Sequence, residues 1–428
     1  MGAAVSTQAF DVEAVRAQFP ILRSLVHGRV PLHYLDNAAT SQVPDAVLAA
    51  MRRHDETHRA NVKRGVHFLA EAATDAYDAA RGKVARYLNA REDREVIFTS
   101  GTTDAINLVA HAFGATLKPG DEVVVSGLEH HSNLVPWQLL RDRSGIRLKF
   151  LPVTAEGRID TGALDRVVSE RCKLIAVTHV SNVTGAITDV PLIVRAARTV
   201  GARVLLDGAQ RASHGPLDVQ GLGVDLYAIS GHKMFGPTGI GALWGRAEIL
   251  SALPPFLGGG EMIRTVTLEK STWADIPARF EAGTPAITQA VGLGAAIDWH
   301  ASVDNAAATI HTAKLAERVL DGLSAVGGKK RLDGGRLSTG RVRVIGPQTM
   351  ERRFPVIAFA VDGAHPHDIC QILDGHGVAL RGGHHCAQPF HESRNLTGTT
   401  RASLALYNNA ADVDALLTGL DDALGKLT

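Results

Sequence analysis

Seven short apolar segments alternate with helical patterns between residues 95 and 246. The segments are 95–100, 121–126, 147–153, 173–180, 203–209, 226–230 and 241–245. They are rich in Val, Ile and Leu and mostly lack polar alternation, which is typical of strands covered on both faces. Helical patterns such as 103–114 and 190–202 lie between them. This alternation predicts an α/β fold with a mainly parallel central sheet, in which ligands bind beyond the carboxyl ends of the strands.

The pattern changes after about residue 286. A long helical pattern over 287–323 is followed by a Gly- and Arg-rich interval, 327–341, which we interpret as a surface loop. Strands are predicted at 341–346, 354–363 and 378–383, with a helix at 365–377 and a final helix from about 411. We therefore expect a large domain, 31–295, and a small α+β C-terminal domain, 296–428. The N-terminal segment, 1–30, is expected to pack with the small domain.

Charge and cysteine content argue against several kinds of partner. Lys and Arg number 45 against 44 Asp and Glu, which gives a net charge of +1. No basic field is therefore expected to hold a nucleic acid or a membrane surface. No stretch approaches 18 consecutive apolar residues, and the N-terminus lacks the pattern of a secretory signal. Cys172, Cys370 and Cys386 are odd in number and widely spaced, so we expect free thiols and a cytoplasmic location.

A lysine at the end of a predicted strand is the first candidate functional residue. Lys233 follows the apolar segment 226–230 and precedes a glycine-rich loop. Lysine is rarely buried unless its amine is occupied, so we expect a ligand here. Asp207 and Gln210 follow another strand and would lie at the same edge of a parallel sheet. Taken alone, Asp207 could equally cap a turn.

A second candidate is the turn Gly101-Thr102-Thr103, between a predicted strand and a predicted helix. Backbone N–H groups, the helix dipole and the threonine hydroxyls would together form an anion site. The alternative is an ordinary helix start, with Thr102 or Thr103 as the capping residue. Arg401 opens an apolar strand near the other end of the chain, where its guanidinium would need an anionic partner.

Histidines accompany a cysteine in the segment RGGHHCAQP. Cys386, which follows Arg381, two glycines, His384 and His385, could have a lowered pKa and act as a nucleophile. An unreactive loop thiol and a metal site are the alternatives. A second histidine pair begins with His130, and zinc is conceivable there, although no further ligand pair has the required spacing.

Pyridoxal 5′-phosphate (PLP) accounts for these elements together. It offers an aldehyde for Lys233, a basic ring nitrogen for Asp207, an aromatic face for His130 and a phosphate for Thr102 and Thr103. An imine with the aldehyde would explain the buried lysine. The Asp207 carboxylate would keep the pyridinium protonated, so that the ring can accept electrons. We expect PLP as the cofactor and no metal.

The chain resembles the class V, fold-type I PLP-dependent transferases, which share the aspartate-aminotransferase-like fold. Within them it is similar to the group II cysteine desulfurases of the SufS type. The motifs that carry the resemblance are DGAQ, SGHKMFGPTGIG, GGGEMI, FEAGTP and RGGHHCAQP, and the similarity extends from PLHYLDNAATSQVP to TRASLALYN. The resemblance implies a homodimer.

The resemblance also implies a role for each matched residue. Lys233 would form the imine and shuttle the proton, and Cys386 would accept the sulfur. His130 would stack on the ring and assist proton transfer, Asp207 would pair with the pyridine nitrogen, and Gln210 would bond the ring hydroxyl. The phosphate would be held by Thr102, Thr103, Ser230 and His232, and the phosphate of the other subunit by Thr284. Arg401 and Asn182 would hold the substrate carboxylate, and Arg381 would line the substrate pocket.

The implied reaction converts L-cysteine to L-alanine and leaves the sulfur as a persulfide on Cys386, for iron–sulfur cluster assembly. Because the cysteine loop is short, a SufE- or SufU-like acceptor protein would have to approach the site. A selenocysteine lyase or cysteine sulfinate desulfinase of the same family is the alternative, with L-selenocysteine as a possible substrate. A Cys–His hydrolase would leave Lys233 and Asp207 unexplained, and a non-catalytic PLP-binding homologue would not need both Lys233 and Cys386. Lys63 departs from the group, in which a histidine is common at the site entrance.

Overall fold

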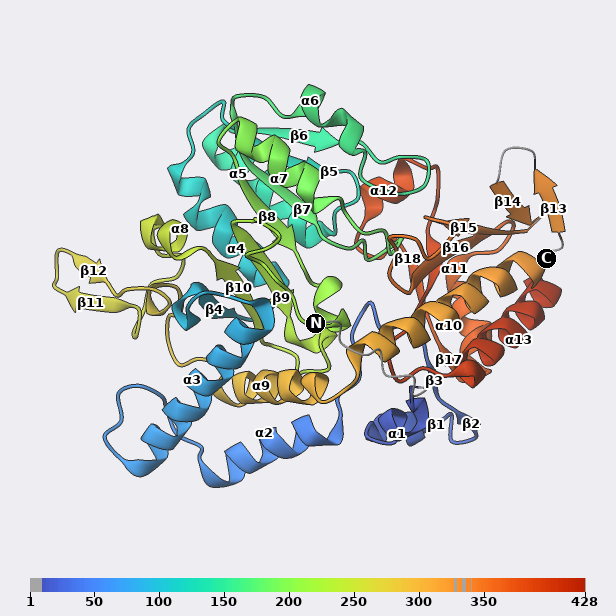
Figure 1. Ribbon diagram of the computed structural model, residues 1–428, viewed down its shortest axis with the longest axis horizontal. Helices are drawn as coiled ribbons and strands as arrows, with labels where there is room; N and C mark the ends of the chain where they lie inside the picture. Colours follow the sequence, from blue (N-terminus) through green and yellow to red (C-terminus); the bar gives the residue numbers. More distant parts are fainter. Residues whose placement is uncertain (1–9, 327–328, 333–335, 340, 428) are drawn as a thin grey trace, which may run out of the picture.

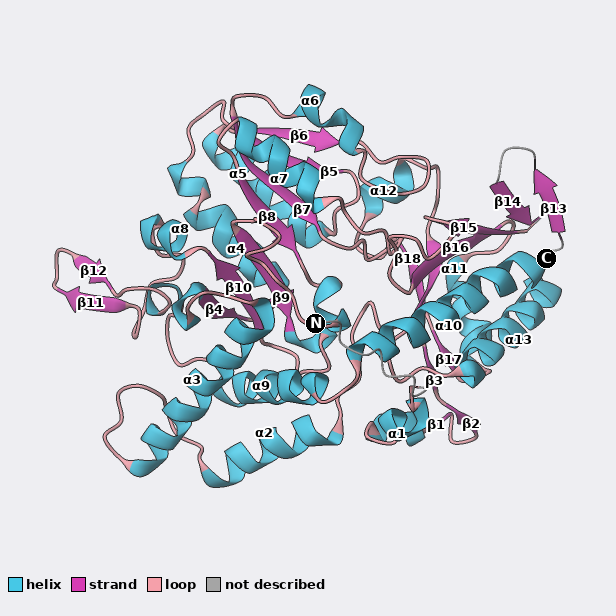
Figure 2. Cartoon of the chain, in the orientation of Figure 1, coloured by secondary structure: helices cyan, strands magenta, loops and turns pink. Residues whose placement is uncertain are grey.

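A seven-stranded sheet forms the centre of the large domain (Figures 1 and 2). The computed structural model describes residues 10–326, 329–332, 336–339 and 341–427. The strands are β4 (Val96–Thr99), β5 (Glu122–Ser126), β6 (Arg147–Leu151), β7 (Cys172–Thr178), β8 (Arg203–Asp207), β9 (Leu226–Ser230) and β10 (Gly241–Gly245). Their order is β4-β10-β9-β8-β7-β5-β6, and only β10 is antiparallel to its neighbours. The predicted mainly parallel sheet is confirmed.

Helices cover both faces of this sheet, which explains why most of its strands lack polar alternation. In β8, Leu205 packs on one side with α4 and α5, while Val204 and Leu206 pack on the other side with α3, α7 and α9. The helices of this domain are α2 (Asp45–Thr57), α3 (Phe68–Leu88), α4 (Thr102–Ala112), α5 (Val135–Ser144), α6 (Leu164–Val167), α7 (Val190–Thr199), α8 (Ala247–Ala252) and α9 (Ile287–Ala301). A hairpin of β11 (Ile263–Val266) and β12 (Ser271–Trp273) projects from the domain.

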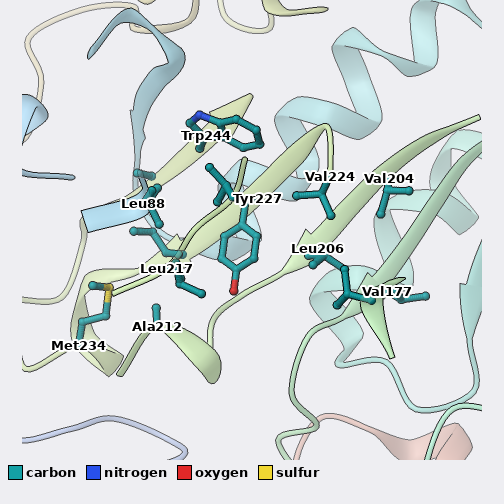
Figure 3. Packing of buried hydrophobic residues seen from close by; sticks show 14 of the residues in the cluster. Leu88, Val177, Val204, Leu206, Ala212, Leu217, Val224, Tyr227, Met234 and Trp244 are labelled. Carbon is teal, nitrogen blue, oxygen red and sulfur yellow. The ribbon is translucent and has the colours of Figure 1, made fainter. Parts of the chain in front are cut away.

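The core beneath the carboxyl ends of β7, β8 and β9 is dense (Figure 3). Val177, Leu206 and Tyr227 belong to one buried cluster that also includes Met234, the residue after Lys233. The buried Tyr227 hydroxyl forms a 2.8 Å hydrogen bond with His179 Nδ1. These contacts hold the ends of three neighbouring strands together on the core side of the sheet.

The C-terminal domain is built on a four-stranded antiparallel sheet of order β15-β16-β19-β18. Its strands are β15 (Val342–Ile345), β16 (Val356–Val361), β18 (Arg381–Gly383) and β19 (Thr399–Ser403). Its helices are α10 (Asn305–Val326), α11 (Pro366–Asp374), α12 (Gln388–Glu392) and α13 (Ala410–Leu427). The predicted strand at 378–383 is in fact two strands, because β17 (Val378–Ala379) leaves this sheet to pair with β3 (His33–Tyr34).

Two other predictions for this region are wrong. The helical pattern over 287–323 is interrupted between α9 and α10, where Asp304 Oδ1 accepts the Ala307 N–H at 3.0 Å and so starts a new helix. The interval predicted as a surface loop contains β13 (Lys329–Leu332) and β14 (Arg336–Thr339), which pair antiparallel. Backbone pairing of this kind needs no apolar pattern. Residues 327–328, 333–335 and 340 of that interval lie outside the described residues.

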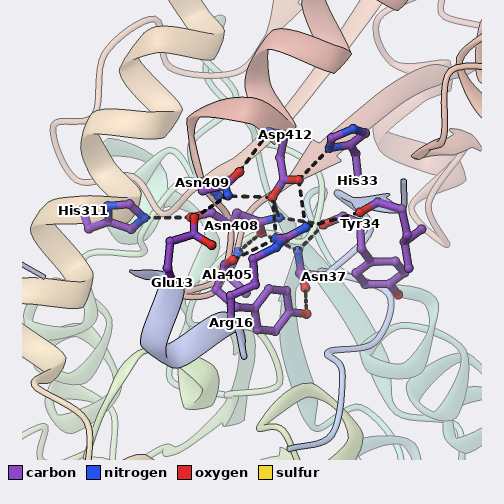
Figure 4. Close-up of polar contacts among 12 residues, drawn as sticks. Glu13, Arg16, His33, Tyr34, Asn37, His311, Ala405, Asn408, Asn409 and Asp412 are labelled. Carbon is purple, nitrogen blue, oxygen red and sulfur yellow. Dashed lines mark hydrogen bonds and ion pairs between the residues drawn. The ribbon is translucent and has the colours of Figure 1, made fainter. Parts of the chain in front are cut away.

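A buried carboxylate ties the N-terminal segment to the C-terminal domain (Figure 4). Asp412, at the start of α13, accepts hydrogen bonds from Arg16 Nη1 at 3.0 Å, His33 Nδ1 at 2.8 Å and Asn408 Nδ2 at 2.8 Å. Arg16 ends α1 (Val12–Arg16), which precedes the pair of β1 (Leu25–Val26) and β2 (Val30–Pro31). Burial raises the pKa of Asp412, but the bonds from His33 and Asn408 and the Arg16 charge hold it below 3.8 overall.

We expect Asp412→Ala to lower the free energy of unfolding by about 3 kcal/mol, because it removes a buried carboxylate and leaves the half-buried Arg16 charge without its partner. Since the folded-state pKa of Asp412 is depressed, its contribution is present above about pH 4 and is lost as the pH falls through the folded-state value. Urea unfolding at pH 7 and at several pH values below 4 measures both effects. Asp414→Ala, which removes an exposed partner of Arg318, is the control and should cost less than about 1 kcal/mol; equal losses in the two variants would contradict the assignment.

Candidate active site

One cavity of about 180 Å³ lies at the carboxyl ends of the central strands, facing the C-terminal domain. Every residue singled out for the site except Thr284 lines it. These residues are Thr102, Thr103, His130, Asn182, Asp207, Gln210, Ser230, His232, Lys233, Arg381, Cys386 and Arg401. The structure therefore brings together side chains that are separated by up to three hundred residues in sequence, while their individual roles stay predictions.

Lys233 ends a 3-10 turn that follows β9 directly. Its side chain is half-buried, and burial lowers the pKa of its amine to about 8, against the opposing effect of the Asp207 carboxylate. The turn is held from outside the sheet, because Thr40 Oγ1 and the Ser41 N–H both donate to the His232 carbonyl at 2.9 Å. An amine with this pKa is available in its neutral form near physiological pH, as a base or a nucleophile requires.

Asp207 ends β8, the neighbour of β9. Its carboxylate is buried, and burial raises its pKa, while the Ala209 N–H and the Lys233 charge lower it. The turn-capping alternative is observed, since Oδ1 accepts the Ala209 N–H at 2.9 Å. The same carboxylate nevertheless lines the cavity, so the cap fixes its orientation there. Gln210 Nε2 donates to the Ala38 carbonyl at 2.8 Å.

The predicted anion site, the turn that contains Thr102 and Thr103, lines the cavity. Helix α4 begins at Thr102 with Gly101 as its capping residue, so the alternative in which a threonine caps the helix is wrong. Ser230 Oγ accepts the Thr102 N–H at 2.8 Å and donates to Thr102 Oγ1 at 2.9 Å. Thr103 Oγ1 lies 2.6 Å from Ser132 Oγ, which also lines the cavity. Hydroxyls at a helix N-terminus are suited to a phosphate.

The two adjacent histidines make different contacts. Burial, with the Lys233 charge next, lowers the pKa of His130 to about 3, so the ring is neutral. Its Nδ1 accepts the Ser132 N–H at 3.1 Å, which leaves the ring hydrogen on Nε2. His131 instead contacts the Cys386 loop: its N–H donates to the Cys386 carbonyl at 2.7 Å. Among the described residues no group of three or more His, Cys, Asp or Glu is arranged to hold a metal ion.

Arg401 is a buried cation that lines the same cavity as Lys233. It is buried on β19, with Nη2 donating to Asp36 Oδ1 at 2.8 Å and Nη1 to the Asn182 carbonyl at 3.0 Å. Its Nε is buried and has no hydrogen-bond partner within the described residues. Arg381 lies opposite Arg401 on the paired strand β18. Two cations beside a cavity favour a ligand that carries a carboxylate.

The Cys386 loop has an unusual backbone. His385 and Cys386 have φ angles of +52° and +57°, and neither is glycine. A left-handed conformation costs about 1–2 kcal/mol for a residue with a side chain. Such a loop needs external support, and Asn182 Nδ2 provides part of it by donating to the His385 carbonyl at 2.7 Å. Strained residues of this kind occur most often at functional sites.

Two residues named in the sequence analysis, Thr284 and Lys63, do not line this cavity. Thr284 is exposed on the loop before α9 and does not line the cavity of its own chain. Lys63 Nζ lies 3.8 Å from Glu281 Oε2 and 5.6 Å from the centre of the Tyr77 ring. The sequence analysis assigned no role to Ser132 or to the segment 36–41, whose Ala38 and Ala39 line the cavity. The position of Ser132, two residues after His130, was the available signal.

The fold and the cavity together define a fold-type I PLP-dependent enzyme. An amine, a buried carboxylate and a hydroxyl-lined helix start match the aldehyde, ring nitrogen and phosphate of PLP, so the residues present fit this cofactor. The sequence profile of the family described as aminotransferase class-V matches residues 33–416. The chain belongs to this family, which confirms the predicted fold and cofactor.

Individual relatives narrow the comparison. The chain is 48% identical over 416 residues to a probable cysteine desulfurase of Streptomyces coelicolor, covering 96% of each. It is 46% identical over 426 residues to probable cysteine desulfurase 2 of Mycobacterium leprae, covering 98% of each. The crystal structure of the cysteine desulfurase CsdA from Escherichia coli superposes with a TM-score of 0.88 at 39% identity, covering 98% of this chain and 100% of that one. The predicted resemblance to cysteine desulfurases is confirmed.

In the cofactor-free chain, we expect the Lys233 amine to become reactive with a midpoint near pH 8. Burial disfavours its charged form, so the neutral, acylatable amine forms below the pH at which an ordinary lysine loses its proton. Pulse acetylation at a series of pH values, followed by peptide mass spectrometry, measures this midpoint. Exposed Lys314 is the control, and a Lys233 midpoint at or above that of Lys314 would contradict the described environment.

Proposed function

We propose that this chain is a PLP-dependent cysteine desulfurase that takes sulfur from L-cysteine onto Cys386 and releases L-alanine. The observation that carries the proposal is that Lys233, from the end of β9, and Cys386, from the loop after β18, line the same cavity. A lysine alone would serve many reactions of amino acids. A cysteine held opposite it, on the other domain, supplies the acceptor that sulfur transfer needs.

When bound, PLP draws electrons away from the Cα of the amino acid attached to it. Lys233 then removes the Cα proton, since burial keeps much of its amine neutral near pH 8. Asp207 holds a proton at the ring nitrogen, and neutral His130 covers the ring face and assists proton transfer. Arg401 and Asn182 orient the substrate carboxylate. The remaining implied contacts are Thr102, Thr103, Ser230 and His232 with the phosphate, Gln210 with the ring hydroxyl and Arg381 with the substrate.

Sulfur transfer is completed by Cys386. Its thiolate attacks the sulfur of the substrate, and an S–S bond forms as the Cβ–S bond breaks. The electron pair of the broken bond stays with Cβ, which takes up a proton and becomes the methyl group of alanine, and the proton held by Lys233 returns to Cα. The sulfur remains on Cys386 as a persulfide. Arg381 and Arg401 line the cavity together with Cys386.

Further parts of the proposal concern what lies beyond one chain. A homodimer would place the exposed Thr284 at the phosphate of the partner subunit. A SufE- or SufU-like protein would collect the persulfide sulfur for iron–sulfur cluster assembly, in the cytoplasm. Within the described residues no helix has the length and apolar character needed to cross a membrane. We also propose the expected division into segments 1–30, 31–295 and 296–428, although α9 continues past residue 295 to Ala301.

We expect Cys386→Ala to keep PLP and bind L-cysteine but to lose sulfide production, because no thiolate remains to accept the sulfur. Mass spectrometry after incubation of the wild type with L-cysteine should find one added sulfur on the Cys386 peptide, and free alanine should appear. Cys370→Ala is the matched control, because burial raises the pKa of that thiol to about 12. Wild-type sulfide release by Cys386→Ala would refute the assignment; L-selenocysteine and cysteine sulfinate, tested in parallel, identify the alternative substrates.

Mixed dimers test whether Thr284 acts across subunits. A Lys233→Ala chain paired with a Thr284→Ala chain contains one site with an intact lysine and an intact threonine if Thr284 reaches the partner. The same mixed dimer has no intact site if Thr284 serves its own chain. We therefore expect the mixed dimer, separated by two affinity tags, to regain one site with wild-type PLP affinity. PLP affinity no better than that of the Thr284→Ala homodimer would contradict the arrangement.

A further inference from the structure

The loop that carries Cys386 is anchored on its small-domain side by a chain of hydrogen bonds. His391 Nδ1 donates to the Ala387 carbonyl at 3.0 Å, so its Nε2 accepts from Thr399 Oγ1, 3.0 Å away. The Thr399 hydroxyl in turn accepts from His385 Nε2 at 2.9 Å. All three side chains are buried. These bonds hold His385 and Ala387, the residues on either side of Cys386, but none of them contacts Cys386 itself.

The large domain holds Cys386 and the residues after it through His131. The His131 N–H donates to the Cys386 carbonyl at 2.7 Å. Its ring Nε2 accepts the Gln388 N–H, at the start of α12, at 3.1 Å. His131 of the large domain therefore forms hydrogen bonds with both ends of the segment 386–388. This contact crosses from the domain that carries Lys233 to the domain that carries the cysteine.

His131 is adjacent in the chain to His130. His130, its neighbour, lines the cavity on the side of Lys233. The turn that contains both histidines is supported by buried side chains: Glu129 accepts from Asn133 Nδ2 at 2.7 Å, and Asn133 Oδ1 accepts from Trp137 Nε1 at 3.1 Å. Thus His130 lines the cavity near Lys233, while the adjacent His131 contacts the cysteine loop.

We propose that His131 is a positioning residue that sets the place of the Cys386 thiol relative to the substrate. The proposal rests on the sulfur-accepting role of Cys386 given above. His131 acts through its ring acceptor, which must be unprotonated to receive the Gln388 N–H. Burial and the nearby His384 lower the pKa of His131 and keep the ring neutral. Without this acceptor the left-handed His385–Cys386 pair loses one of its supports.

Three substitutions separate the ring acceptor from the rest of the residue. His131→Gln places a carbonyl oxygen near the position of Nε2, whereas His131→Asn is one methylene shorter and His131→Ala has no acceptor. All three keep the backbone N–H that bonds to Cys386. His367→Ala is the control, because this exposed histidine lies against Gly382 at the start of the same loop.

We expect His131→Ala and His131→Asn to lower kcat for sulfide release roughly three- to tenfold, as the loss of one hydrogen bond implies. KM for L-cysteine and the absorbance of bound PLP should stay at wild-type values. Amide hydrogen exchange in peptides covering 384–388 should become faster in the cofactor-free chain, which needs no turnover. His131→Gln should recover most of the rate and of the protection, and His367→Ala should match the wild type.

Equal kcat and equal exchange in wild type, His131→Ala and His131→Asn would overturn the proposal. So would failure of His131→Gln to differ from His131→Asn, because the acceptor would then not be the active feature. A parallel loss of PLP absorbance and thermal stability in all three variants would show a general structural role instead. If the wild type forms no persulfide on Cys386, the proposed function fails, whereas the exchange result still reports on the contact between His131 and the loop.

Discussion

The site depends on an amine and a carboxylate held at the ends of two neighbouring parallel strands. Asp207 ends β8, and Lys233 follows the end of β9 after one short turn. Burial raises the pKa of the carboxyl and lowers that of the amine to about 8, so each group has a protonation equilibrium displaced towards its neutral form. Groups displaced in this way within one cavity are suited to exchanging protons with a ligand.

The rest of the molecule fixes these two groups from three directions. Tyr227, in β9, and Met234, the residue after Lys233, belong to the buried core of the large domain (Figure 3). Segment 36–41 lines the cavity through Ala38 and Ala39. It also bonds to both domains, because the Ser41 N–H donates to the His232 carbonyl and Asp36 pairs with Arg401. The Asp412 network then holds the chain just before this segment. The N-terminal residues therefore take part in building the cavity, although most of them do not line it.

Much of the fold could be predicted because its signals are local. Most strands of the central sheet contain a run of apolar residues bounded by polar ones, and the mainly parallel arrangement follows from the helices between the runs. The hairpin β13–β14 and the division at residue 304 were missed. The hairpin forms by backbone pairing, which leaves no apolar pattern in the sequence. The division between α9 and α10 depends on a single capping aspartate, Asp304, inside a continuous helical pattern.

The site was predictable only where residue type itself signals chemistry. Lys233, Asp207 and Cys386 are conspicuous after strands or glycines, and resemblance supplied their roles. Ser132 and the 36–41 segment contribute through hydroxyl and backbone contacts that carry no compositional signal. The Asp36 partner of Arg401 lies 365 residues away, so the predicted need for an anion could be stated but its source could not.

The central claim is that Lys233 carries the cofactor as an imine. Reduction of the PLP-loaded protein with borohydride, followed by peptide mapping, tests it directly. The account predicts one phosphopyridoxyl group per chain, on the peptide that contains Lys233. A chain that stays colourless with added PLP, or a label found on another lysine, would contradict it.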